Sequence, residues 1–328
     1  MRTAAPIRPV DIAGWGRRVM QAHQRISSWV VETPCEPVTG SIAGGPARLL
    51  FKREDLQHTG SFKLRGASNK LLVLTPEERA AGVIAASNGN HGLGVAAGAR
   101  TLGVSAEVYV SSHVSPAKAR KIEEYGAVVR RAGSDPLDAE LAGRAAARKA
   151  GKAFISPYND ADVMAGQGTI AVELLHQSPS LDAVFVAVGG GGLVGGIGAY
   201  LKWISPQTEI VGCWPENSRV LYESIKAGYI VSFPELPTLS ESTAGGLEPE
   251  TITLDVCRTV IDRSVLVTED EILAAMRLAR KTHGWVMEGA AAVALAAFLK
   301  QAAAYTGKTV AVVICGGNVS PEVLSRLQ

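Results

Sequence analysis

The chain has 328 residues, of which 47% are hydrophobic and 20% charged, so it can form one large domain or two ordinary ones around a sizeable core. Its 33 basic and 31 acidic residues leave a net charge of +2 with no long run of either sign, so there is no electrostatic footprint for nucleic acid. The four cysteines lack the CxxC spacing of a zinc site or a disulfide framework and favour a reducing, cytoplasmic setting.

The predicted elements alternate between apolar strands and helices along the chain. Two helix starts carry capping residues, Thr75-Pro76-Glu77-Glu78 and Thr268-Glu269-Asp270-Glu271. Strands are predicted at 48–52, 83–86, 106–110, 127–130, 154–155, 184–188, 209–212, 264–267 and 309–314, with helices near 93–101, 116–125, 136–149, 193–203, 269–282 and 286–299. Val/Ile/Ala strands alternating with helices predict parallel sheets that are covered on both faces, and their number predicts two α/β domains with a cleft between them.

The sequence shows neither a signal peptide nor a membrane span. Residues 1–18 lack the apolar stretch of a signal peptide. The most apolar run, Val286–Leu299, is interrupted by Glu288 and is shorter than the roughly 18 residues that cross a bilayer, so we expect a buried helix there.

The strongest motif is Gly189-Gly190-Gly191-Gly192-Leu193, which follows a strand and opens a helix. Glycines let the backbone approach a ligand closely, and the positive end of a helix favours a phosphate. A tight turn without a ligand is one alternative. The other is a dinucleotide-binding oxidoreductase, because Gly190, Gly192 and Gly195 match GxGxxG, although the next strand ends in Cys213-Trp214 rather than in an acid for the ribose.

Two further glycine loops follow strands. Residues 87–92 (SNGNHG) offer amides, a hydroxyl and an imidazole at a helix start, which suits a carboxylate, although a capped Asn-Gly turn would contain the same residues. Residues 315–318 (CGGN) follow the last strand, at the end where ligands of α/β proteins bind, although Cys315 could equally be buried and inert. Lys63 lies in a turn-like Thr-Gly-Ser run between Phe62 and Leu64, as either an exposed lysine or one held for chemistry.

Together, GSFKLRGA, SNGNHG, VGGGGLVGG and CGGN resemble the fold-type II pyridoxal-phosphate enzymes, in particular the serine/threonine dehydratase and serine racemase group, from Arg48 to Val319. The resemblance implies a tryptophan synthase β-like fold of two three-layer α/β/α domains with parallel-rich sheets. It implies a large cofactor-binding domain of residues 1–78 and 156–328, and a small domain of residues 79–155 that closes on the substrate.

The resemblance also assigns roles to residues. The cofactor is pyridoxal 5′-phosphate, and Lys63 binds its aldehyde covalently and removes the α-proton of the substrate. The other residues expected at the cofactor are Phe62 and Glu288 beside the ring, Asn90 at the ring hydroxyl, Gly189, Gly190, Gly191, Gly192 and Leu193 at the phosphate, and Cys315 at the ring nitrogen. Ser87, Asn88 and His91 are expected to hold the substrate carboxylate, and Gly246 to face the substrate side chain.

The resulting interpretation is a lyase that removes water from a β-hydroxy amino acid such as threonine or serine and yields a 2-oxo acid and ammonia. The alternative within the group is β-replacement, as in cysteine synthases, and the nicotinamide oxidoreductase is the alternative outside it. By resemblance a homodimer is expected, and a small amino acid is the expected partner, with neither nucleic acid nor membrane.

Three positions depart from the pattern of the group. Racemases carry a second serine where this chain has Asn88, so we expect little racemisation. Many relatives hold a divalent cation through acids that match Trp214 and Val220, so we expect no metal there. Dehydratases and racemases carry an acid at the position of Gly245; its loss indicates a different, larger substrate and resembles dehydratases of hydroxyectoine-utilisation pathways.

Overall fold

The computed structural model describes residues 9–38 and 47–327, and it contains two β-sheets. The large sheet has the order β1 (Cys35–Pro37), β2 (Arg48–Arg53), β10 (Thr309–Ile314), β7 (Ala183–Ala187), β8 (Glu209–Pro215) and β9 (Arg263–Val267), with only β1 antiparallel. The small sheet has the order β5 (Val128–Arg131), β4 (Ala106–Val110), β3 (Val83–Ala86) and β6 (Ala153–Ile155), all parallel.

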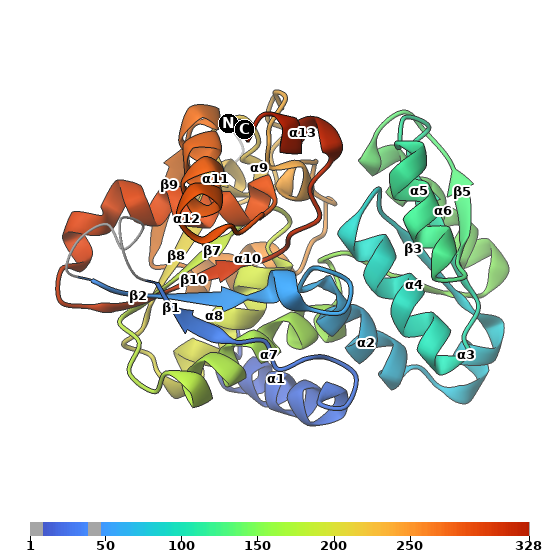
Figure 1. The fold of residues 1–328 in the computed structure, drawn as a ribbon. Coiled ribbons are helices and arrows are strands. Elements are labelled where there is room, and N and C mark those ends of the chain that lie inside the picture. Colours follow the sequence, from blue (N-terminus) through green and yellow to red (C-terminus); the bar gives the residue numbers. More distant parts are fainter. Residues whose placement is uncertain (1–8, 39–46, 328) are drawn as a thin grey trace.

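Helices separate the strands and cover both sheets (Figure 1). The α-helices are α1 (Ile12–Ile26), α2 (Lys63–Val73), α3 (Pro76–Ala81), α4 (Asn90–Leu102), α5 (Pro116–Glu124), α6 (Pro136–Ala150), α7 (Ala161–Gln177), α8 (Gly192–Ile204), α9 (Val220–Ala227), α10 (Thr253–Val260), α11 (Glu269–His283), α12 (Gly289–Gln301) and α13 (Pro321–Ser325). Short 3₁₀ turns lie at η2 (Glu54–Leu56), η3 (Glu241–Thr243) and η4 (Ala302–Tyr305).

Each sheet is the middle of three layers. In the large unit α12 packs on the strands with α11 against it, while α8, α7 and α1 pack together on the other side (Figure 1). In the small unit Val108 faces α4 and α5, whereas its neighbour Tyr109 faces α6, because successive strand side chains point to opposite faces. The predicted α/β class with parallel-rich sheets is confirmed.

The two sheets have separate hydrophobic cores, and α2 joins them. Ala67 and Leu71 of α2 are fully buried in the core of the small unit, together with the strands β3 and β4. The same helix crosses α7 of the large unit at Gly66 and Gly166, where a Cβ on either residue would lie 2.6 Å from backbone atoms of the other helix. The division after residue 78 stays a prediction, since α2 packs against both units.

The local predictions agree with the structure in the strands and in two helix caps, but the helices α1, α2, α7, α9, α10 and α13 were not predicted. Every predicted strand is present, and both capping boxes, at Thr75 and Thr268, are formed. The short strand β1 was not expected; it ends in Pro37 and lies at the sheet edge, where a proline is tolerated. Lys63 was expected to lie in a turn, and this is wrong, because Lys63 is the first residue of α2. The helix expected at 286–299 begins three residues later, at Gly289.

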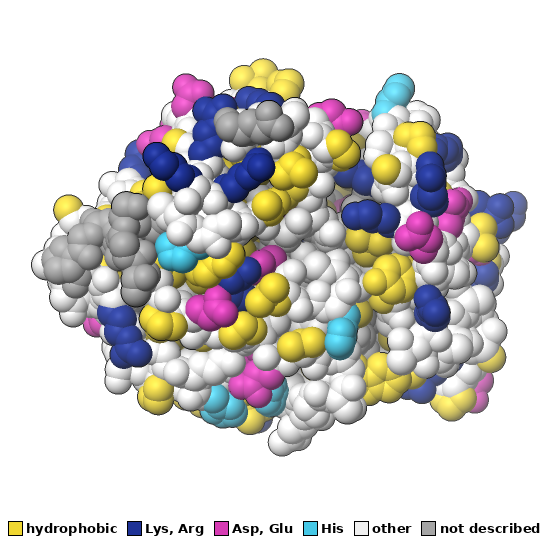
Figure 2. All heavy atoms as spheres, in the orientation of Figure 1, with side chains coloured by type: hydrophobic (Ala, Val, Ile, Leu, Met, Phe, Trp, Pro, Cys, Tyr) yellow, Lys and Arg dark blue, Asp and Glu magenta, His cyan; other side chains and the backbone are white. Residues whose placement is uncertain are grey.

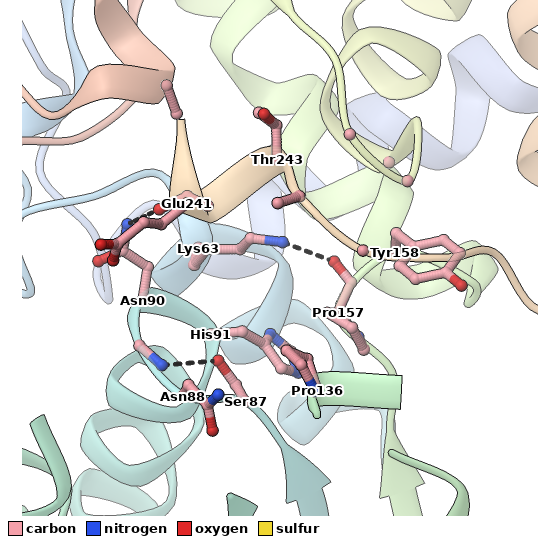
Figure 3. A pocket seen from close by; sticks show the side chains of 18 of the residues that line it. Lys63, Ser87, Asn88, Asn90, His91, Pro136, Pro157, Tyr158, Glu241 and Thr243 are labelled. Carbon is pink, nitrogen blue, oxygen red and sulfur yellow. Dashed lines mark hydrogen bonds between the residues drawn. The ribbon is translucent and has the colours of Figure 1, made fainter. Parts of the chain in front are cut away.

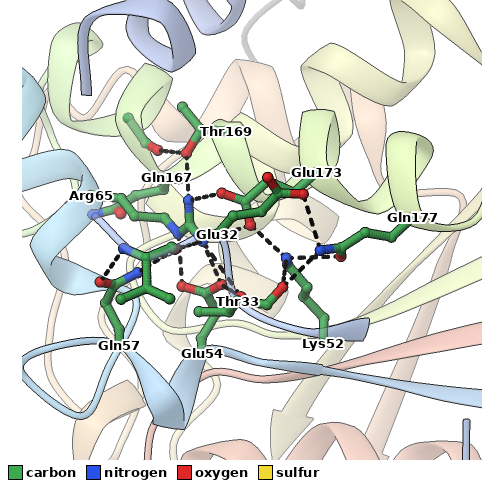
Figure 4. Close-up of polar contacts among 12 residues, drawn as sticks. Glu32, Thr33, Lys52, Glu54, Gln57, Arg65, Gln167, Thr169, Glu173 and Gln177 are labelled. Atoms are coloured by element: carbon green, nitrogen blue, oxygen red, sulfur yellow. Dashed lines mark hydrogen bonds and ion pairs between the residues drawn. The ribbon is translucent and has the colours of Figure 1, made fainter. Parts of the chain in front are cut away.

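A buried group of charged side chains lies directly behind the start of α2 (Figure 4). We call it the Arg65 cluster; its members are Lys52, Glu54, Arg65 and Glu173, and all four are at most 2% exposed. The Arg65 guanidinium donates to both oxygens of Glu54, at 2.7 and 2.8 Å, and to both oxygens of Glu173, at 2.6 and 2.8 Å. Two cations and two carboxylates balance, so the first turn of α2 is fixed to η2 and α7 without a net buried charge.

On the surface, charged groups of both signs are interspersed. On the face shown in Figure 2, basic side chains lie scattered with acidic ones between them, as the near-neutral composition predicts. Among the helices of the described ranges, none has both the length and the hydropathy needed to cross a membrane.

Replacement of Arg65 by Met should lower the free energy of unfolding by about 3–5 kcal/mol, because Glu54 and Glu173 would then share only Lys52 in the interior. Urea denaturation measures this loss. The matched control is Arg130→Met, which removes an exposed partner of Glu107 and should cost at most about 1 kcal/mol. Equal losses of unfolding free energy in the two variants would contradict the claim that breaking the Arg65 cluster destabilises the fold more than breaking an exposed ion pair does.

Candidate active site

A cavity of about 540 Å³ lies between the two units, at the carboxyl ends of their parallel strands. The loops after β3, β7 and β10 and the first residues of α2 all reach it. Together with the segment 235–246, they bring together the predicted residues Phe62, Lys63, Ser87, Asn88, Asn90, His91, Gly189, Gly190, Gly191, Gly192, Leu193, Gly246 and Cys315. Glu288 lies directly behind this lining and contacts Asn90. The predicted candidates therefore converge, as expected for ligand sites in α/β proteins.

The Lys63 side chain points into the cavity from the first turn of α2, between Asn90 and Tyr158 (Figure 3). Its Nζ donates a hydrogen bond of 2.8 Å to the Pro157 carbonyl. Burial lowers the pKa of this amine to about 8, and the nearby Cys315, Glu140 and Glu288 offset only part of the effect. An amine with this pKa is available as a neutral nucleophile and base near physiological pH.

The segment before Lys63 is held by the third glycine loop. The Phe62 amide donates to the Cys315 carbonyl at 3.1 Å, and the Gly317 amide donates to the Gly60 carbonyl at 2.9 Å. Gly60 has a φ of +71°, a conformation that favours glycine, so the chain can turn into α2 at this point. Burial raises the pKa of the Cys315 thiol well above 9, and Glu288 adds to the shift, so this side chain is a neutral thiol.

The tetraglycine run opens α8 with an arrangement that larger residues would obstruct. Gly191 is the N-cap of the helix and has a φ of +88°. A Cβ on Gly190 would lie 2.4 Å from the Tyr158 ring, and one on Gly189 would lie 2.8 Å from the Thr243 backbone. The first N–H groups of a helix lack partners within the helix, so this end of α8 can accept a phosphate in the cavity.

Asn90 is the centre of a chain of amide and carboxyl groups. Its Nδ2 donates to Glu288 Oε2 at 2.8 Å, and its Oδ1 accepts from Asn318 Nδ2 at 2.8 Å. Burial raises the pKa of Glu288, although Asn90 counteracts the shift, and Glu288 Oε1 lacks a hydrogen-bond partner among the described residues. A buried, unpartnered oxygen beside the cavity fits a ligand that carries a hydrogen-bond donor.

The loop after β3 presents the start of α4 to the cavity. The buried His91 shares Nε2 with the Ile155 carbonyl at 2.9 Å, and burial together with Lys63 lowers its pKa to about 3. The neutral imidazole must then donate from Nε2, which leaves Nδ1 as an unpartnered acceptor among the described residues. The Asn88 side chain is bound at both ends to Ser111, with distances of 2.8 and 2.9 Å.

The cavity also contains residues that the sequence did not single out. Pro157 and Tyr158 follow β6, and their position at the carboxyl end of a strand is the signal that could have identified them. Further residues of this kind are Lys118, Pro136, Leu137, Glu140, Glu235 and Glu241. They belong to α5, α6 and the 235–246 segment, where no motif marks them.

The positions discussed for a cation hold buried apolar side chains. Trp214 and Val220 lie in the hydrophobic core of the large unit. Within residues 9–38 and 47–327, no three His, Cys, Asp or Glu side chains are close enough to hold a metal ion. The prediction that the protein uses no metal stays a prediction.

A lysine with a lowered pKa, a glycine-rich helix start for a phosphate, and a buried amide and thiol beside them fit pyridoxal phosphate. The family model for pyridoxal-phosphate dependent enzymes matches residues 26–316, and the chain belongs to this family. It is 37% identical to an L-threonine ammonia-lyase of Thermotoga maritima over 88% of this chain and 71% of the relative. It is 35% identical to a phenylserine dehydratase of Ralstonia pickettii over 92% of each chain.

A solved structure has the same fold. The processed threonine deaminase isoform 2 of Solanum lycopersicum superposes with a TM-score of 0.91 at 28% identity, over 100% of this chain and 96% of that chain. These similarities decide against the nicotinamide alternative, and the protein is dependent on pyridoxal phosphate.

The rate at which cofactor-free protein takes up pyridoxal phosphate covalently should rise with pH and level off above about pH 8, because only the neutral Lys63 amine attacks the aldehyde. The visible absorbance of the bound cofactor, followed from about pH 6 to about pH 10, measures this rate. Nα-acetyl-lysine is the control and should keep gaining rate toward the ordinary lysine pKa of 10.5. A protein profile that matches this control would contradict the desolvation of Lys63.

Proposed function

We propose that the protein is an ammonia-lyase that removes water from a β-hydroxy amino acid and releases a 2-oxo acid and ammonia. The observation that carries the proposal is the Lys63 amine, which lies between the phosphate-binding end of α8 and the carboxylate-binding start of α4. The names of the relatives, an L-threonine ammonia-lyase and a phenylserine dehydratase, support the same reaction class.

When bound, the pyridoxal ring withdraws electrons from the bonds at the substrate Cα. In the elimination, the Cα–H and Cβ–O bonds of the substrate break and a Cα=Cβ bond forms, so the hydroxyl leaves with a proton as water. Hydrolysis of the resulting unsaturated amino acid then gives the 2-oxo acid and ammonia. Lys63, neutral near its pKa of about 8, accepts the Cα proton. The backbone N–H groups at the start of α4, with Ser87, hold the substrate carboxylate.

The thiol expected at the ring nitrogen favours elimination. Cys315 is a neutral thiol, so it does not place a negative charge beside the ring nitrogen as an aspartate would. Without a negative charge beside it, the bound ring would withdraw electrons less strongly, which favours prompt loss of the β-hydroxyl over transamination. Asn90, which donates to Glu288, would hold the ring hydroxyl.

The finer assignments belong to this proposal as well. Threonine and serine are candidate substrates, and the missing acid at Gly245 supports a larger one, such as an amino acid derived from hydroxyectoine. We propose a homodimer that acts in the cytoplasm without a metal ion. The four cysteines of the described residues are free thiols, which supports a reducing setting.

Purified protein with pyridoxal phosphate should release 2-oxo acid and ammonia from L-threonine or L-serine when no nucleophile is added, whereas β-replacement requires one. Lys63→Ala should lower kcat by at least about 10³-fold, because it removes both the covalent attachment and the base. The control, Lys118→Ala, removes an exposed cation from the same cavity and should retain most of the activity. Turnover only in the presence of an added thiol would instead favour β-replacement.

D-serine should form from L-serine at no more than about a hundredth of the rate of 2-oxo acid release, because the racemase serine is replaced by Asn88 and an amide is not an acid-base group. Both Asn88 side-chain atoms are also engaged with Ser111. Chiral chromatography of the reaction mixture measures D-serine directly. Comparable rates of racemisation and elimination would contradict this expectation.

A further inference from the structure

The cavity has a wall that neither the cofactor residues nor the carboxylate loop form. It consists of the first turns of α6, with Pro136, Leu137 and Glu140, together with Tyr158 and the segment 235–246. The substrate Cα must lie near Lys63 and its carboxylate at the start of α4, so the side chain beyond Cβ extends toward this wall. The side chains of the wall are therefore the candidates for contact with the substrate side chain.

Glu140 is the unusual member of this wall. Its exposed fraction is only 7%, although it lines the cavity. The other charged groups of the described lining, apart from Lys63, are exposed and already partnered. Lys118 pairs with Glu241, and Glu235 accepts hydrogen bonds of 3.0 Å from Ser218 and from the Gly245 amide.

The charges around Glu140 do not balance. Arg144 is shared between Glu140 and Glu248, but it bonds closely to Glu248 and lies 3.4 Å from Glu140. Glu248 also accepts a hydrogen bond of 2.8 Å from the Asn159 amide. Two carboxylates thus face one guanidinium, and the ion pair of Glu140 with Arg144 is the weaker of the two.

The consequence is a carboxyl group that resists ionisation. Burial raises the pKa of Glu140, and Glu248 adds to the shift. Arg144 lowers the pKa of Glu140 and compensates the buried carboxyl only in part. A ligand cation placed here would supply that compensation, whereas a methyl group would not.

We propose that Glu140 binds a cationic nitrogen at the far end of the substrate side chain, and that the substrate is a β-hydroxy amino acid with an amino group beyond Cβ. The inference rests on the proposed function and names its substrate class. An alkyl side chain would leave the buried carboxyl without a partner from the ligand, whereas an ammonium would stabilise its ionised form.

Binding can be tested without turnover by using two amino acids that lack the β-hydroxyl and are close in shape. L-2,4-diaminobutyrate carries an ammonium where L-2-aminopentanoate carries a methyl group. Calorimetry on the protein loaded with pyridoxal phosphate should give a Kd at least about tenfold lower for the diamino acid, as expected for a hydrogen bond between charged groups. Glu140→Gln should reduce this ratio by about tenfold.

The matched control is Glu241→Gln, which removes the same charge from the exposed rim of the cavity and should keep the ratio within about threefold. A wild-type protein without preference, or a Glu140→Gln variant with an unchanged ratio, would overturn the inference. Equal losses in the two variants would also overturn it, since they would indicate a general effect of net charge.

Turnover separates this inference from the proposed function. L-2,4-diamino-3-hydroxybutyrate and L-2-amino-3-hydroxypentanoate are the hydroxylated forms of the same pair, and kcat/KM from 2-oxo acid release should favour the first by at least about tenfold. Release of 2-oxo acid without that preference would overturn the role of Glu140 and leave the proposed lyase activity standing. Preferential binding without release from any β-hydroxy amino acid would overturn the lyase and leave the cation site intact.

Discussion

The guanidinium of Arg65, fully buried between the carboxylates of Glu54 and Glu173, is the constraint on which the site depends. It lies two residues after Lys63, in the same helical turn, so fixing Arg65 to η2 and α7 also fixes the origin of the Lys63 side chain. Such an ion cluster adds little net stability to a core, because the free energy of removing the charges from water offsets much of their attraction. Its directional hydrogen bonds, however, specify a single orientation for the start of α2.

The chemistry of the cleft follows from the position of the first turn of α2, which carries Lys63. Because α2 packs against both units, the Lys63 amine lies at their junction rather than on the surface of either. Burial there lowers its pKa to about 8, while its bond to the Pro157 carbonyl holds it over the cavity. The positive end of α8 on one side and that of α4 on the other supply separate positions for a phosphate and a carboxylate.

Much of the fold and the centre of the site could be predicted from the sequence. Continuous apolar strands with glycine loops at their ends identify parallel sheets locally, and four short motifs carry the family resemblance. The helix α7 carried no such signal, because nearly every residue from Val163 to Leu174 is buried and no polar face marks a period. Lys63 could be identified by its motif, but its place at the start of a helix depends on tertiary contacts of Arg65.

Contacts between distant segments were beyond sequence reasoning for the same reason. Glu140 lies on α6 and lines the cavity. Its charge environment depends on Arg144, which pairs with both Glu140 and Glu248, and Glu248 is more than a hundred residues further along the chain. In the sequence, Glu140 is one acid on an ordinary amphipathic helix. Only the packing of α6 beside Tyr158 and segment 235–246 turns it into a buried group that faces a ligand.

The central claim is that Lys63, and no other lysine, is the residue that reacts with the cofactor. Reduction of the loaded protein with borohydride makes the attachment permanent, and peptide mapping by mass spectrometry then locates the pyridoxyl group. We expect the label on Lys63, in the peptide that ends at Arg65, at close to one label per chain. A label on another lysine, or a protein that retains none after reduction, would contradict it.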